Sequence, residues 1–256
     1  MDFCEKRLLS LISAQEWHLD RLYGHYTNEF GALFRNYNGR MTDERKRQFK
    51  RLLLAFNNDL ERLMAQQIES SITLSNACQD SFIKDYIKDL DLSNDQAGKL
   101  FLRNEAAANT FLSRTGKGLK LSERVWSLTK QTEEAMNILL ESGVVNGRPA
   151  PEMARDLKKY LKYPDKQFRR IRNEEGKLIL SKPASEFHPG QGVYRSSYKN
   201  ALRLSRTEVN MAYRANDFER RKNLPFVMRT ASHMTRKKPE KPSRSITPSS
   251  CSSCAR

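Results

Sequence analysis

The sequence contains no apolar stretch of the roughly 18 residues that a membrane-spanning helix needs, so we expect no membrane span. Only four of its 256 residues are cysteines, and only four are histidines. Cys4 and Cys78 are isolated, and the Cys251-x-x-Cys254 pair lies in a stretch without regular apolar spacing. The sequence therefore indicates no disulfide framework, no bound metal and a reducing, cytoplasmic environment.

Patterns that carry catalysis are scarce as well. No histidine has the HExxH spacing of a metalloprotease, and the Thr115–Leu119 segment lacks the spacing of a phosphate-binding loop. We therefore expect a protein that is not an enzyme, with no catalytic residues and no cofactor. An active site assembled from residues far apart in the sequence stays open as an alternative.

Positive charge is unevenly distributed along the chain, whose formal net charge is +16. Residues 1–154 hold 21 basic and 21 acidic residues, whereas residues 155–228 hold 18 and 8, and residues 229–256 hold 7 and 1. This asymmetry indicates a neutral scaffold followed by a surface that meets nucleic acid or an acidic protein. A basic, solvated face without a dedicated partner is the alternative.

Apolar residues recur at helical spacing over the first hundred residues. A helix over residues 3–30 is predicted by Leu9, Ile12, Leu19, Tyr23, Tyr26 and Phe30. Thr42 is placed to cap a second, long helix, whose apolar seam is Phe49, Leu53, Phe56, Leu60 and Leu63. We expect these two helices to pack antiparallel across the Asn-Gly turn near residue 38. Trp17 and Trp126 are expected to be packing anchors.

Weaker signals continue the helical pattern. Ser93 and Gln96 form a candidate capping box, and Gly143 is placed to end a helix that opens at Leu121. Further helices are expected over residues 76–90, 94–113, 121–143 and from Pro151 onwards, with a short strand at 178–180. The predicted fold class is mainly α. It comprises an elongated helical hairpin or bundle over residues 1–115, a smaller, partly complete α(+β) domain over 120–228, and a disordered basic tail over 229–256.

The most regular late segment is a helix over residues 195–224, which Pro225 ends. One face, expected to be buried, carries Tyr198, Leu202, Ser205, Val209, Ala212 and Asn216. Another face carries basic residues one to two turns apart, at Lys199, Arg203, Arg206, Arg214 and Arg221, with Asn210 and Asp217 interrupting the row. Because guanidinium groups at this spacing match a row of phosphates or carboxylates, these five residues are the predicted contacts with a partner protein or nucleic acid.

The same helix carries a short motif made of Arg206, Thr207, Glu208, Ala212 and Asn216. Upstream lie a helix that opens at residues 121–126 and a short helix over residues 147–157, separated by a glycine-bounded turn. Together these elements resemble the phage head morphogenesis family that is named after the F protein of phage Mu. The resemblance covers roughly residues 120–224, and it makes Arg206, Thr207, Glu208 and Asn216 the family-motif residues.

This resemblance implies a minor virion component that acts in head assembly. Its expected partners are the portal protein, capsid or scaffold proteins and packaged DNA, and its expected location is the phage head, or the host cytoplasm during assembly. The family continues with a small α+β portion that residues 229–256 do not resemble, so we expect the domain to be truncated or frame-shifted there. A sequence-independent nucleic-acid-binding module and the remnant of a phage-borne toxin fusion stay open as alternatives.

Overall fold

The computed structural model describes residues 3–35, 42–116, 118–145, 147–162, 170–180, 185, 191–222 and 224. The predicted turn near residue 38, the predicted disordered tail and the Cys251-x-x-Cys254 pair lie outside the described residues.

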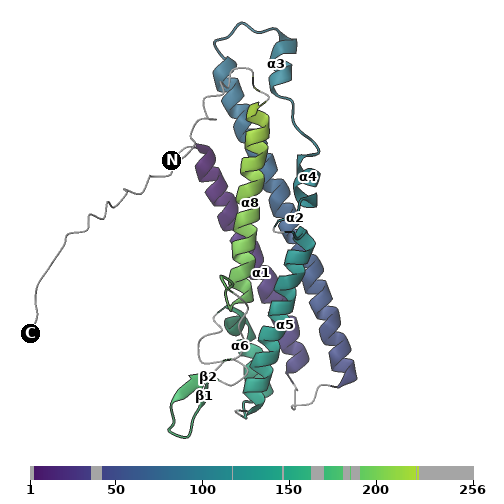
Figure 1. Ribbon diagram of the computed structural model, residues 1–256, viewed down its shortest axis with the longest axis vertical. Coiled ribbons are helices and arrows are strands. Elements are labelled where there is room, and N and C mark those ends of the chain that lie inside the picture. Colours follow the sequence, from purple (N-terminus) through teal and green to yellow (C-terminus); the bar gives the residue numbers. More distant parts are fainter. Residues whose placement is uncertain are drawn as a thin grey trace, which may run out of the picture.

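The described part of the chain is mainly α, as predicted. It contains seven helices and one two-stranded hairpin: α1 (Phe3–Phe34), α2 (Asp43–Ile87), α3 (Asn94–Leu100), α4 (Ala107–Ser113), α5 (Leu121–Val145), α6 (Ala150–Lys162), β1 (Arg170–Arg172), β2 (Leu178–Leu180) and α8 (Ser197–Lys222). Figure 1 shows an elongated bundle in which α1, α2, α5 and α8 run along the long axis. The β1–β2 hairpin, paired antiparallel, lies at one end and α3 at the other. None of the described helices has both the length and the apolar character needed to cross a bilayer.

An aromatic cluster joins α1 to α2 near the end where the two helices connect. The ring of Tyr23 lies edge-on to Phe56 with centroids 5.1 Å apart, and Phe30 meets Phe49 at 5.4 Å. These side chains are almost fully buried, as the apolar spacing predicts. Thr42 caps α2 by accepting a hydrogen bond from the backbone N–H of Arg45, which confirms its predicted role.

The predicted helix over residues 76–90 is not a separate element, because α2 continues without a break to Ile87. Small and polar residues interrupt the apolar period at Ser71, Ser75 and Asn76, yet all three are buried against other helices. A buried face does not have to be apolar when its polar groups find partners. The interruption was therefore wrongly interpreted as a boundary.

Two other predicted boundaries also differ from the structure. The capping box of Ser93 and Gln96 is confirmed, but it opens a helix that ends at Leu100, and residues 107–113 form a separate helix. Gly143 does not end α5, which runs to Val145. A Cβ atom at position 143 would meet the side chain of Met153, so the glycine lets α5 and α6 pack closely with Met153 in its present position.

Polar side chains form several direct hydrogen bonds between α8 and α2. We call this contact the polar seam; it comprises Gln67, Ser75, Asn76, Ser205, Asn216 and Arg220. Ser205 Oγ donates to Gln67 Oε1 at 2.7 Å, and Asn216 Nδ2 donates to Asn76 Oδ1 at 2.9 Å. Val209 and Ala212 are buried on the same helix as predicted, whereas Tyr198 and Leu202 are only partly buried.

One hydrophobic core extends through both of the predicted segments, 1–115 and 120–228. It includes residues of α1 and α2 as well as Val125 and Met136 of α5, Leu157 of α6 and Ala201 of α8. The later helices thus pack directly on the first hairpin.

Cysteine and tryptophan residues occupy positions that the sequence interpretation did not predict. Cys4 on α1 and Cys78 on α2 form a disulfide with Cα atoms 5.9 Å apart, so the expectation that they are unpaired was wrong. The antiparallel packing of α1 and α2 brings together two residues 74 positions apart.

Trp17 and Trp126 are 55% and 43% exposed, so neither is a buried packing anchor. Arg21 and Lys130 lie over their rings instead.

Candidate functional site

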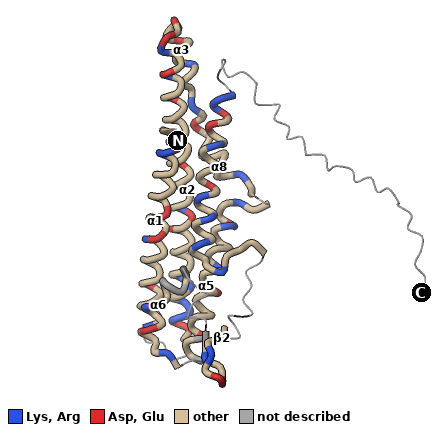
Figure 2. Tube along the Cα trace, turned by 90° about the vertical axis from the view of Figure 1, so that its left-hand side faces the viewer, with Lys and Arg blue, Asp and Glu red and all other residues tan. Residues whose placement is uncertain are grey.

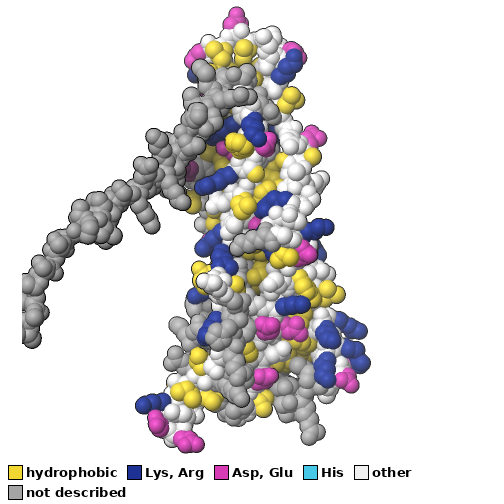
Figure 3. All heavy atoms as spheres, in the orientation of Figure 1, with side chains coloured by type: hydrophobic (Ala, Val, Ile, Leu, Met, Phe, Trp, Pro, Cys, Tyr) yellow, Lys and Arg dark blue, Asp and Glu magenta, His cyan; other side chains and the backbone are white. Residues whose placement is uncertain are grey.

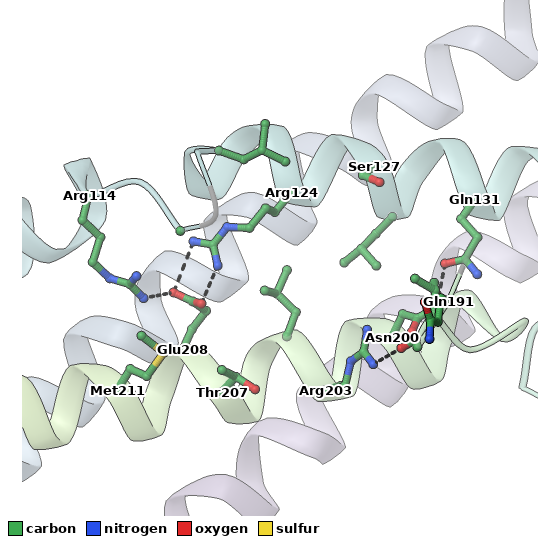
Figure 4. A pocket seen from close by; sticks show the side chains of 16 residues that line it. Arg114, Arg124, Ser127, Gln131, Gln191, Asn200, Arg203, Thr207, Glu208 and Met211 are labelled. Atoms are coloured by element: carbon green, nitrogen blue, oxygen red, sulfur yellow. Dashed lines mark hydrogen bonds and ion pairs between the residues drawn. The ribbon is translucent and has the colours of Figure 1, made fainter. Parts of the chain in front are cut away.

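A groove of about 680 Å³ lies between α5 and α8, next to the loops that precede each of these helices. Its walls are contributed by four segments that are distant in the sequence: residues 114–119, α5, residues 191–193 and α8. Figure 4 shows polar side chains from α5 and α8 converging on this space from both sides. The groove contains three of the residues singled out from the sequence, which are Arg203, Thr207 and Glu208.

Glu208 is the acidic group of the groove, and it is held between two arginines. Its carboxylate, 2% exposed, accepts hydrogen bonds from Arg114 Nη2 and Arg124 Nη1, both at 2.5 Å. Arg124 Nη2 lies 3.4 Å from the second oxygen, so Arg124 binds both oxygens of the carboxylate (Figure 4). Two guanidinium groups against one carboxylate leave this end of the groove with a net positive charge.

The conformation of the loop before α5 positions the guanidinium groups of Arg114 and Arg124 against Glu208. Gly116 and Leu119 pair across a tight turn, in which Gly118 adopts a positive φ of 80°. A Cβ atom at position 116 would lie 3.3 Å from Arg124 Nη1, so a side chain there would crowd the guanidinium. The guanidinium of Arg114 is held from its other side by the ring of Phe111, with Cζ 3.9 Å from the ring centroid.

The opposite end of the groove is a network of uncharged groups. Asn200 Nδ2 donates to Gln131 Oε1 at 2.8 Å, and Gln131 Nε2 donates to the backbone oxygen of Tyr194 at 2.6 Å. Asn200 also accepts a hydrogen bond from the backbone N–H of Tyr194 at 3.0 Å. Ser196 caps α8 by accepting a hydrogen bond from the backbone N–H of Lys199. These bonds fasten the loop before α8 to both helices, so this wall of the groove is preformed.

The predicted basic face of α8 is exposed, but most of its members interact within the chain. Arg203 donates to the backbone oxygen of Gly192 and lies over the ring of Tyr194, which also lines a shallow neighbouring hollow with Lys199 and Arg206. Arg206 Nε donates to Glu16 Oε1 at 2.6 Å. These contacts fix the direction of the side chains without burying the charges.

The remaining two predicted contact residues lie further along α8. Arg221 pairs with Asp217 at 3.0 Å, one turn away. Arg214 is exposed and lacks an ion-pair partner within the part of the chain that the structure describes. Positions occupied by Lys or Arg recur along α8 in Figure 2. The five residues are therefore spread along the helix, and only Arg203 lines the groove between α5 and α8.

The family-motif residues divide between three environments. Arg206 reaches outward to α1, and Thr207 is exposed beside the groove. Glu208 is buried against Arg114 and Arg124, and Asn216 belongs to the polar seam. The motif thus combines residues that position α8 with residues that face the groove.

Apolar side chains complete the surface around these charges. Leu119 and Met211 are 44% and 45% exposed, and Val193 is also exposed. In Figure 3, hydrophobic side chains alternate with basic ones on the face that α5 and α8 present. Exposed apolar groups clustered with guanidinium groups are typical of a protein-binding surface.

Arg114, Arg124 and Gln131 were not among the predicted site residues. Glu208, the carboxylate that Arg124 binds, lies 84 residues further along the chain, so no local pattern relates the two. Among the described residues no group of three or more His, Cys, Asp or Glu could hold a metal ion. A scan of protein-family models and searches of curated proteins and of solved structures matched nothing to this chain.

Proposed function

We propose that this protein is a minor component of a phage head that acts in head assembly by docking to the portal or to the interior of the procapsid. The surface that docks is the face formed by α5, α8 and the loops before them. The phage setting derives from the sequence motif centred on Arg206, Thr207 and Glu208. No catalytic role is proposed.

The observation that carries this proposal is the combination of a preformed groove with exposed cations spread along the same face of α8. Rigid long helices position these cations, and the ion pair of Arg206 with Glu16 ties α8 to α1. Charge of one sign on a rigid surface increases the rate of association with an oppositely charged partner and makes binding depend on salt. A protein that must find a large assembly benefits from both properties.

The test is co-purification with the portal protein at increasing salt concentration. We expect the complex to weaken as salt rises and to weaken further when Arg203, Arg206 and Arg214 are all changed to Glu. Unchanged co-purification after the triple substitution would contradict the role of this face. A purified protein that shifts DNA in a gel in a salt-dependent manner, but does not bind portal, would instead favour the nucleic-acid-binding alternative.

A further inference from the structure

We infer that the groove between α5 and α8 binds an acidic, amphipathic protein segment, whose carboxylates meet Arg114, Arg124 and Arg203 and whose apolar side chains cover the aliphatic floor. This inference rests on the proposed docking function and specifies the chemistry of the partner at that site.

Charge is the first reason. The residues that line the groove include three arginines and one carboxylate, so they carry a formal net charge of 3 − 1 = +2. Glu208 neutralises only one of these charges, and the side chains of Arg114 and Arg124 remain 23% and 18% exposed. Guanidinium groups bind carboxylates and phosphates with the same bidentate geometry, so charge alone selects an anionic partner but not its class.

The floor of the groove favours a protein carboxylate over a nucleic-acid phosphate as the anion that binds. It is aliphatic, being formed by Leu119, Leu128, Val193, Leu204 and Met211. None of the 16 lining residues is aromatic, so no ring is present on which a nucleic-acid base could stack. Aliphatic side chains of a protein segment would instead remove the exposed surface of Leu119 and Met211 from water. The combination favours protein over nucleic acid.

The shape of the groove agrees with this assignment. Its volume of about 680 Å³ accommodates several side chains of one segment, and two long helices, α5 and α8, form most of its walls. An amphipathic segment docked between two helices buries its apolar face in the groove, and its other face stays in contact with the rest of the partner protein. Gln131 and Asn200, at the far end of the groove, are uncharged, so the part of the segment that lies there does not need acidic residues.

The matched variants are two substitutions on the same helix. Arg203 lines the groove, whereas Arg214, although it is also exposed on the basic face of α8, does not line the groove. Arg203→Glu and Arg214→Glu change the net charge of the protein by the same amount, so any difference between them reports on position rather than on overall charge. Thr207→Trp provides a third variant, because it fills the groove without altering its charge.

The experiment measures fluorescence anisotropy of a labelled synthetic helix that carries Glu on one face and Leu on the other. Two control peptides replace either the Glu residues with Lys or the Leu residues with Ser, and a single-stranded oligonucleotide is the fourth probe. We expect only the Glu/Leu peptide to bind tightly, with about tenfold weaker affinity for Arg203→Glu and for Thr207→Trp and an affinity within about twofold of wild type for Arg214→Glu. Thermal melting of each variant verifies that it is folded.

Equal weakening by Arg203→Glu and Arg214→Glu, unaltered binding by Thr207→Trp, or tighter binding of the oligonucleotide would each overturn the inference. Self-association of the full-length protein that is abolished by Arg203→Glu would make the occupant a second copy and would overturn the assignment to a partner segment. Portal co-purification of the same variants separates the two proposals: a portal complex that forms without peptide binding removes only this inference.

Discussion

The aromatic cluster between α1 and α2 and the polar seam between α2 and α8 join helices by different physical means. The cluster excludes water from large rings such as Tyr23 and Phe56, whose attraction tolerates small changes in position. The seam aligns individual donors with individual acceptors, such as Asn216 with Asn76, and a shift of one residue would break them all. The comparison indicates that the cluster provides stability, whereas the seam fixes the register of α8 and therefore the direction of its charges.

The largest effect should come from the aromatic cluster. Phe56→Ala removes a fully buried ring that contacts Tyr23 and Tyr26, and it leaves a cavity between α1 and α2. We expect a loss of about 3–5 kcal/mol in the free energy of unfolding. Chemical denaturation of both proteins measures it. A loss as small as that from a surface substitution would show that the cluster is not the main source of stability.

A smaller effect is expected in the polar seam. Asn216→Ala removes two hydrogen bonds, to Ser75 Oγ at 3.1 Å and to Asn76 Oδ1 at 2.9 Å, and leaves buried polar groups without partners. The expected loss in the free energy of unfolding is about 1–3 kcal/mol. Because α8 would lose its register, binding at the groove should weaken more than this loss of stability explains. The matched control is Phe56→Ala, whose folded fraction should bind normally.

The smallest expected effect is on how the free energy of unfolding depends on pH in acid. Burial raises the pKa of Asp80, but hydrogen bonds from Arg103 and Arg220 outweigh it and hold the pKa below its usual value. A carboxylate with a lowered pKa stabilises the folded state above the pKa of the unfolded chain, and this contribution is lost as the pH falls through the folded pKa. Unfolding measured from pH 7 down to pH 3 should therefore show a shallower acid dependence in Asp80→Asn than in wild type. An identical dependence would contradict the contribution of this group.

The same contrast explains how much could be predicted from the sequence. Apolar spacing correctly predicted the helices that bury Leu19, Tyr23, Phe49 and Phe56, because large side chains at helical intervals carry a strong periodic signal. The seam carries none, since its serines and asparagines resemble exposed residues until their partners are known. This is why the uninterrupted course of α2 through Ser75 was missed.

Only some residues of the groove were predicted, because the contacts that form it join residues far apart in the sequence. Arg203 and Glu208 lie on a helix that was recognised from its own pattern, together with its exposed basic face. Arg114 and Arg124 reach Glu208 across 94 and 84 residues, and no local pattern relates residues so far apart.

Site-specific photo-cross-linking during head assembly tests the central claim most directly. A photoreactive residue is placed at Thr207, which lines the groove, or at Leu54, which is also exposed but lies on α2 and does not line the groove. The account predicts a covalent product with the portal protein or another head protein from position 207, mapped by mass spectrometry to an acidic, apolar segment, and none from position 54. The same product from both positions, or from position 54 alone, would contradict it.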